Sequence, residues 1–184
     1  ALKRLNHPNV VRLIDSGEQD GCYYLVTEYV EGQNLALYLR SNTPTIKRVV
    51  EIMVQVCDAI TYAHLNGIVH RDIKPANIIV SEDEVKVLDF GLAQITGKDS
   101  GLTTLTRTDL AMGTINYLSP EQRLNAKDVD ERSDIFSLGI VFFEMLTGPL
   151  PLGSFEPPSK LRKDAPKRCN HIVNRSLNTN PDLR

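Results

Sequence analysis

A carboxylate, a lysine and an amide lie close together in the segment from residue 70 to 77, which reads His-Arg-Asp-Ile-Lys-Pro-Ala-Asn. Phosphoryl transfer to a hydroxyl requires groups of these three kinds. Asp72 would orient the attacking hydroxyl and accept its proton, and Lys74 would neutralise charge on the moving phosphoryl oxygens. The amide oxygen of Asn77 would bind a magnesium ion. The segment therefore predicts phosphoryl-transfer chemistry.

A second acidic element follows shortly afterwards, where Asp89-Phe90-Gly91 succeeds the expected strand 85–88. A carboxylate at this place is a hard oxygen ligand suited to a magnesium ion that bridges phosphates. Gly91 permits a sharp backbone turn behind it. Taken alone, the tripeptide indicates only a turn after a strand. Together with residues 70–77, it predicts a two-ligand magnesium site.

The order and spacing of these two segments resemble the catalytic loop and the Asp-Phe-Gly element of the protein kinase family. Residues 113–121 resemble the substrate-facing loop and the Ala-Pro-Glu element of that family, with Ser119 in the place of the alanine. Residues 133–139 resemble the start of its central helix. The resemblance implies that Gly113 and Thr114 face the substrate. It also implies structural roles for His70, Phe90, Gly91, Glu121 and Asp134, the last holding the catalytic loop through its backbone.

The subtype follows from Lys74 and Thr114, which resemble serine/threonine kinases. Residues 119–122 and 133–148 are most similar to the eukaryotic-type serine/threonine kinases of bacteria. The resemblance implies ATP and Mg²⁺ as cofactors, and serine or threonine hydroxyls of protein substrates as acceptors. Many kinases of this kind carry a membrane anchor outside the catalytic domain, which leaves anchoring of a parent chain open.

The nucleotide site is implied by the same resemblance. Residues 2–10 resemble the end of the family's C helix running into a strand, which places Thr27 at the gatekeeper position. Glu28 would then bond adenine through its carbonyl and Val30 through its amide. Ile79 would lie beneath the ring. Backbone hydrogen bonds and an apolar floor suit a flat heterocycle.

Residues 91–112 show no periodicity and are rich in Gly and Thr. So long an irregular segment usually has a function. By resemblance, Thr106 and Thr108 occupy autophosphorylation positions. Arg71 lies beside the catalytic aspartate and would bind the phosphate.

The expected fold class is α+β, a protein-kinase-like fold truncated at both ends. Residues 1–31 would form part of the N-terminal lobe, and residues 32–184 a mainly helical C-terminal lobe. The expected elements are strands at 10–14, 23–30, 78–80 and 85–88, a short helix at 35–39, a long helix capped by Thr43-Pro44 and ended by Asn66-Gly67, a buried helix at 133–146, and an amphipathic segment at 169–177.

Composition narrows the functional classes. The formal net charge is -2, with 21 basic and 23 acidic residues, so no field attracts nucleic acid. The 3 cysteines are far apart, which argues against a disulfide framework or a zinc site. The longest apolar run, 135–146, is too short to span a bilayer. We therefore expect a cytoplasmic catalytic part without a membrane segment.

Three alternatives remain. The chain contains neither a Gly-x-Gly-x-x-Gly loop nor a Val-Ala-Ile-Lys strand, so it could be an inactive fragment of a longer kinase. A pseudokinase scaffold would usually lack one of the catalytic residues, all of which are present here. A small-molecule kinase would share the acid and the asparagine but not residues 113–121, which are expected to receive a peptide.

Overall fold

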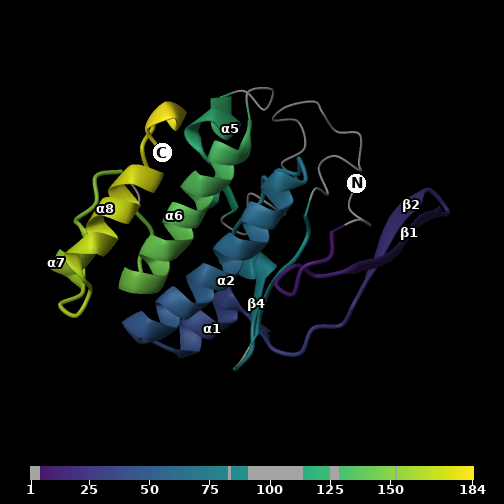
Figure 1. Ribbon diagram of the computed structural model, residues 1–184, viewed down its shortest axis with the longest axis horizontal. Helices are drawn as coiled ribbons and strands as arrows, with labels where there is room; N and C mark the ends of the chain where they lie inside the picture. Colours follow the sequence, from purple (N-terminus) through teal and green to yellow (C-terminus); the bar gives the residue numbers. More distant parts are fainter. Residues whose placement is uncertain (1–4, 83, 91–113, 125–128, 152) are drawn as a thin grey trace.

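The computed structural model describes residues 5–82, 84–90, 114–124, 129–151 and 153–184 (Figure 1). A hairpin lies to one side of a group of helices, and a small sheet lies beside α1 and α2. The arrangement confirms the α+β class. The elements are β1 Leu13–Gln19, β2 Cys22–Thr27, β3 Gln33–Asn34, α1 Leu35–Ser41, α2 Ile46–Leu65, η2 Pro75–Asn77, β4 Ile78–Val80, β5 Val85–Val87, η3 Thr114–Tyr117, α5 Pro120–Leu124, α6 Glu131–Thr147, α7 Pro158–Leu161, α8 Lys167–Ser176 and η5 Pro181–Leu183.

β1 and β2 pair antiparallel around a turn at Asp20-Gly21, where both residues have positive φ, 51° and 75°. That is the backbone conformation of a tight hairpin turn. The predicted bounds of the first strand were wrong, because β1 continues through Ser16-Gly17 instead of ending before it. Gly17 pairs with Tyr24, and a Cβ at Gly17 would lie 2.5 Å from the Tyr24 hydroxyl. Gly17 therefore leaves space for the Tyr24 ring and does not end the strand.

α2 starts later than predicted. The side chain of Thr45 accepts the backbone N–H of Arg48, so Thr45 is the N-cap, and Thr43-Pro44 precedes the helix. The predicted stop is confirmed, because Asn66 caps the helix and Gly67 has a φ of 73°. The buried stripe consists of Val49, Ile52, Val56, Ala59, Ile60 and Ala63.

β3, β4 and β5 form one antiparallel sheet, and the predicted hairpin between β4 and β5 is confirmed. Ile78 pairs with Val87, and Ile79 with Lys86. Val10 extends the sheet through a parallel bridge to Val87. Residues 70–77 precede β4, and Asp89 follows β5. The hairpin therefore positions the two segments for which the sequence predicts phosphoryl-transfer chemistry.

α6 confirms the prediction of a buried central helix and lies between α2 and α8 (Figure 1). Asp130 caps its start, and Gly148, with a φ of 91°, follows its end. α8 approaches α6 so closely that a Cβ at Gly139 would lie 2.3 Å from the Ser176 hydroxyl. α8 begins ahead of the amphipathic segment that the sequence predicted.

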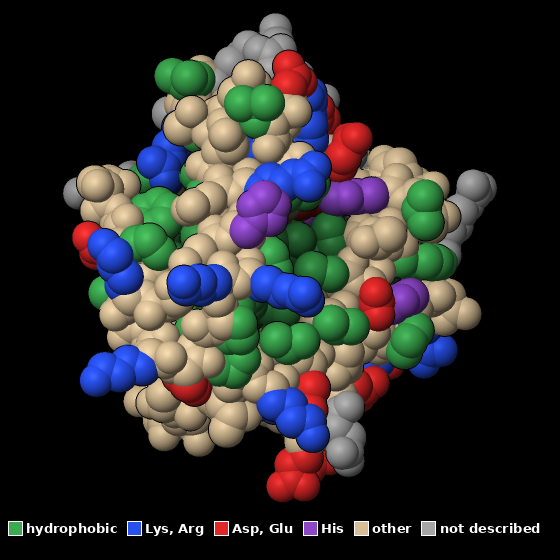
Figure 2. All heavy atoms as spheres, turned by 60° about the vertical axis from the view of Figure 1, so that its left-hand side comes forward, with side chains coloured by type: hydrophobic (Ala, Val, Ile, Leu, Met, Phe, Trp, Pro, Cys, Tyr) green, Lys and Arg blue, Asp and Glu red, His purple; other side chains and the backbone are tan. Residues whose placement is uncertain are grey.

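α8 covers only part of the apolar surface of α2 and α6. A hollow of about 520 Å³ remains between the three helices, lined among others by Val54, Cys57, Phe142 and Ile172. Figure 2, turned to bring the side of α7 and α8 forward, shows apolar side chains in a hollow with Lys, Arg and His side chains around it. Val54 and Ile172 are each 52% exposed.

Candidate active site

Asp134, in the first turn of α6, holds the loop between α2 and η2. Its carboxylate accepts the backbone N–H of His70 at Oδ2 and that of Arg71 at Oδ1, both at 2.8 Å. Nε2 of His64 lies 2.8 Å from the same Oδ2. Asp134 is 1% exposed, and these contacts satisfy a carboxylate that would otherwise be costly to bury. The structure thus brings Asp134 to the loop, as the resemblance implied.

Asp72, Lys74 and Asn77 form one hydrogen-bonded cluster. Nζ of Lys74 lies 2.9 Å from Oδ2 of Asp72. The side-chain amide of Asn77 donates to that same Oδ2 and to the backbone oxygen of Asp72, both at 2.9 Å. The Asp72 side chain stays 43% exposed, whereas Asn77 is buried. The carboxylate is therefore oriented by neighbouring side chains and open to solvent.

His70 links this loop to the segment around Asp89. Nε2 of His70 lies 2.8 Å from the carbonyl oxygen of Leu88, and the Asp72 N–H lies 3.3 Å from Nδ1. Because a carbonyl only accepts, Nε2 carries the hydrogen and Nδ1 is the acceptor. The backbone N–H of Leu88 donates to the carbonyl of Asn77. The rings of His70 and Phe90 pack together with their centroids 4.7 Å apart.

Asp89 follows β5 with a φ of 60°, a left-handed conformation that is uncommon outside glycine. Burial raises the pKa of its carboxyl group, and the nearby Asp72 carboxylate raises it further. The positive charge of Lys74 opposes these effects. A cation bound beside Asp89 would favour the ionised form. Gly91 lies outside the described residues.

A magnesium ion would find few ligands here without a nucleotide. Among the described residues, the Asn77 side-chain amide uses its nitrogen for both hydrogen bonds to Asp72, which leaves Oδ1 as an oxygen for a cation. Asp89 offers a carboxylate. The described part of the chain has no group of three or more His, Cys, Asp and Glu side chains that could hold a metal. The donor set fits a hard cation that takes its remaining ligands from phosphate and water.

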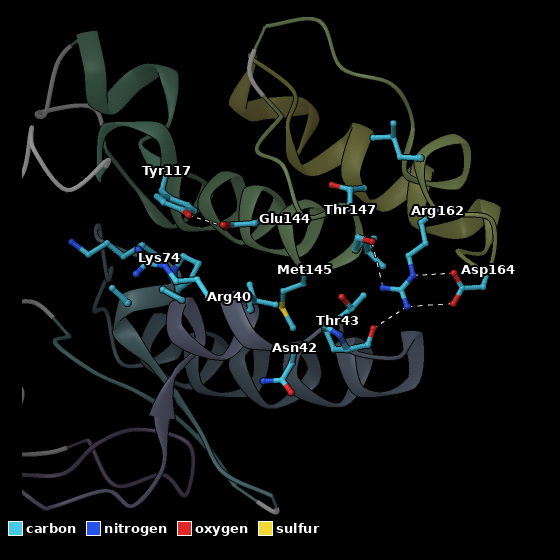
Figure 3. A pocket seen from close by; sticks show the side chains of 18 residues that line it. Arg40, Asn42, Thr43, Lys74, Tyr117, Glu144, Met145, Thr147, Arg162 and Asp164 are labelled. Carbon is cyan, nitrogen blue, oxygen red and sulfur yellow. Dashed lines mark hydrogen bonds and ion pairs between the residues drawn. The ribbon is translucent and has the colours of Figure 1, made fainter.

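A pocket of about 680 Å³ begins at Lys74 and extends between α1 and the end of α6 (Figure 3). The hydroxyl of Tyr117 in η3 donates to Oε2 of Glu144 at 2.7 Å in this pocket. Burial raises the pKa of both groups. Sequence reasoning missed Glu144, because it interrupts the apolar pattern of a helix that was interpreted as buried all round.

The family model for the protein kinase domain matches residues 1–183 of this chain. The chain belongs to the protein kinase family. It is 47% identical to the serine/threonine-protein kinase PrkC of Bacillus subtilis over 80% of this chain and 22% of that protein. It is 40% identical to the serine/threonine-protein kinase PknB of Mycobacterium tuberculosis over 98% of this chain and 32% of that protein.

Solved structures agree with this assignment. The kinase domain of Mycobacterium tuberculosis PknI superposes with a TM-score of 0.78 at 28% identity, covering 100% of this chain and 68% of that one. The chain spans 22% of the length of PrkC and 32% of the length of PknB. Among the residues that the structure describes, no helix is long and apolar enough to cross a membrane.

The kinase hinge was predicted at Glu28 and Val30 through their backbone groups. The structure adds a contact of the Glu28 side chain, whose Oε1 accepts Nζ of Lys86 at 2.9 Å and the Arg12 N–H at 3.0 Å. Burial would raise the pKa of Glu28, but these hydrogen bonds hold it below its ordinary value. Ile79, the expected floor of the adenine site, pairs with Lys86 across the sheet. Sequence reasoning missed Lys86, because only the fold brings it near Glu28.

Glu121, expected to have a structural role, forms the centre of a buried ion pair in this kinase domain. Its carboxylate accepts two hydrogen bonds from Arg184, at 2.5 and 2.9 Å, and one from the Ser133 hydroxyl at 2.6 Å. Burial acts to raise its pKa, but these hydrogen bonds lower the pKa to about 2. Arg184, whose side chain is fully buried, was not singled out from the sequence.

The regulatory prediction concerns residues of which only one is described. Nε of Arg71 is buried and has no hydrogen-bond partner among the described residues, and the backbone of Arg71 has a φ of 68°. Thr106 and Thr108 lie outside the described residues, as does Gly113. Thr114 begins η3.

Proposed function

We propose that the protein containing this chain is a serine/threonine kinase that transfers the γ-phosphoryl group of ATP to hydroxyl groups of protein substrates. The observation that carries this proposal is the cluster of Asp72, Lys74 and Asn77, held by hydrogen bonds within one loop. The names of the relatives PrkC and PknB support the choice of serine and threonine.

The cluster assigns a step to each side chain. The exposed carboxylate of Asp72 orients the substrate hydroxyl and takes its proton as the oxygen attacks the γ-phosphorus. The bond from that phosphorus to the bridging oxygen breaks, and ADP leaves with the electron pair. Lys74, 2.9 Å from Asp72, lies close enough to neutralise charge on the phosphoryl oxygens.

Mg²⁺ would be held by Asn77 and Asp89 together with phosphate oxygens of ATP. The ion supplies charge neutralisation and fixes the phosphates for in-line attack. The chain's own contribution is to position the ligands. Asn77 is fixed by its hydrogen bonds to Asp72, and Asp89 by its strand and by the contacts of His70 with Leu88 and Phe90.

ATP would enter between two parts of the domain, residues 1–31 and residues 32–184. Adenine would bond the carbonyl of Glu28 and the amide of Val30 and lie on Ile79. The contact of Lys86 with Glu28 supports this position, because it fixes the predicted hinge segment to the sheet that carries Ile79. We place this catalytic part in the cytoplasm, where ATP is available, and leave the attachment of the protein to a membrane open.

Regulation would act on Arg71. Its buried Nε has no partner in the described part of the chain, so a phosphate on Thr106 or Thr108 would supply an acceptor for this N–H group. An unphosphorylated loop would leave this buried N–H group unsatisfied, which favours an inactive arrangement.

The test is the full-length gene product incubated with Mg²⁺ and radiolabelled ATP and a mixed protein substrate, followed by phosphoamino-acid analysis. We expect labelled serine and threonine, and loss of label in Asp72→Asn. Label on tyrosine would contradict the acceptor class. ATP binding without any transfer would favour the pseudokinase scaffold, and an inactive chain beside an active full-length product would identify residues 1–184 as an incomplete catalytic unit.

A further inference from the structure

α5 begins with a reciprocal pair of hydrogen bonds between Ser119 and Gln122. The backbone N–H of Gln122 donates to the Ser119 hydroxyl at 3.3 Å, and Oε1 of Gln122 accepts the backbone N–H of Ser119 at 3.0 Å. The Ser119 hydroxyl also lies 3.1 Å from Oε1. This is a capping box, in which the side chains of the first and fourth residues satisfy each other's backbone donors. Ser119 is fully buried.

The opposite end of the Gln122 amide reaches the catalytic loop. Nε2 donates to the carbonyl oxygen of Arg71 at 2.7 Å. The orientation of the amide follows from its partners, since Oε1 faces an N–H group and Nε2 faces a carbonyl. A single side chain therefore caps α5 and tethers the residue directly before Asp72.

The peptide unit between Arg71 and Asp72 is thus held at both of its polar groups. Gln122 holds the carbonyl, and Nδ1 of His70 lies 3.3 Å from the N–H of Asp72. Asp134 fixes the two preceding N–H groups. The positive φ of Arg71, 68°, is a conformation that persists when its surroundings define it. Release of the carbonyl would let this peptide unit rotate and would move the carboxylate of Asp72.

We infer that Gln122 is a positioning residue, which uses the spare N–H group of the α5 capping box to fix the catalytic aspartate. A capping box accepts Gln or Glu at this position, but only Gln can also donate to a carbonyl. Since α5 directly follows the substrate-facing segment of η3, the same amide couples that segment to Asp72. The role of Gln122 in catalysis rests on the proposed kinase function. The hydrogen bond from Gln122 to the Arg71 carbonyl does not depend on that function.

The decisive variant is Gln122→Glu, which keeps the acceptor of the capping box and removes the donor to Arg71. In the full-length protein we expect kcat to fall by about tenfold or more, because misplacement of a reacting group is costly. KM for ATP should stay within about twofold, because Gln122 lies outside the predicted adenine site. The matched control is Leu124→Ala on the same helix, at a side chain that is 81% exposed, which should behave as wild type.

A second variant and a second measurement separate the tether from the cap. Gln122→Leu loses both functions, so its melting temperature should fall below that of Gln122→Glu while its kcat falls at least as far. Wild-type kcat in Gln122→Glu would overturn the inference, as would an equal loss of kcat and of ADP affinity.

Hydrogen exchange measured over residues 68–74 tests the tether in the absence of turnover. Faster exchange in Gln122→Glu than in wild type supports the inference, and unchanged exchange contradicts it. Inactive wild-type protein would count against the proposed kinase function, and the exchange result would still decide the tether.

Discussion

The carboxylate of Asp134 accepts the backbone N–H of His70 at 2.8 Å across 64 positions of the chain. His70 in turn contacts the carbonyl of Leu88, directly before Asp89, through Nε2. A single chain of contacts therefore runs from the buried helix α6 through the catalytic loop to the predicted metal ligand. The geometry of the site depends on the helical core and not on the loop alone.

Asp134→Asn should destabilise the domain. The side-chain amide offers one acceptor where the backbone N–H groups of His70 and Arg71 need two. A buried donor left without a partner costs about 1 to 3 kcal/mol. Chemical denaturation of the variant and of Asp58→Asn, an exposed control on α2, measures the difference. Equal stability of the two variants would contradict the anchoring role.

Asp72→Ala should reduce kcat at least about a hundredfold, the lower range for a positioned acid or base. The affinity for ADP should be nearly unchanged, because the proposed partner of Asp72 is the acceptor hydroxyl and not the adenine. Steady-state kinetics and ADP titration measure the two effects. Activity within a few fold of wild type would show that the carboxylate does not orient or deprotonate the hydroxyl.

Asp89→Ala should abolish magnesium-dependent transfer. The substitution removes a carboxylate close enough to Asp72 to feel its charge. Of the two predicted protein ligands, a hard cation would then keep the amide oxygen of Asn77 alone. A titration of activity with MgCl₂, compared with Asp58→Ala as an exposed control, measures the dependence. An unchanged magnesium requirement with full activity would exclude Asp89 as a ligand.

The separate pieces of the site could be predicted from the sequence, because short segments determine them. Asp72, Lys74 and Asn77 lie within one loop, and their spacing alone brings them near one another. Their roles remain predictions, since the structure supplies geometry and not turnover.

Contacts between distant segments could not be predicted in the same way. The pairs Glu28 with Lys86 and Tyr117 with Glu144 join residues far apart in sequence, and charge alone does not select partners among many acidic and basic residues. Local errors had local causes. Thr45 caps α2 although Thr43 precedes a proline, because its hydroxyl reaches the Arg48 N–H. Gly17 continues a strand because Tyr24 lies against it.

Stability should depend on pH through Glu121. Its folded pKa, about 2, is below the ordinary value of 4.5, so the ionised carboxylate stabilises the fold above pH 4.5, and this contribution is lost as the pH falls toward 2. Glu121→Gln should cost about 1.5 to 3 kcal/mol at neutral pH, the usual range for hydrogen bonds to charged groups. Denaturation at pH 7 and pH 3 should show a smaller difference between wild type and variant at pH 3. A constant difference would contradict the assignment.

Activation should require phosphorylation of Thr106 or Thr108. The described structure supplies one half of the reason, because the buried Nε of Arg71 lacks a partner there. A phosphothreonine adds a charge of about -1.5 to -2 and oxygens that accept hydrogen bonds from arginine. The Thr106→Ala, Thr108→Ala double variant of the full-length protein should therefore lose at least about tenfold in activity, which corresponds to roughly 1.4 kcal/mol of stabilisation of the active loop.

Thr103 and Thr104 provide the matched control, since they belong to the same threonine-rich segment but not to the expected phosphorylation positions. Their double alanine variant should retain activity. Mass spectrometry of active enzyme should find phosphate on Thr106 or Thr108, and phosphatase treatment should lower activity in wild type but not in Arg71→Met. The last comparison is the decisive one, because a phosphate that acts through Arg71 has no effect once the guanidinium group is removed. Fully active enzyme with an unmodified loop would contradict this mechanism, and a phosphatase effect that persists in Arg71→Met would assign the phosphate to another partner.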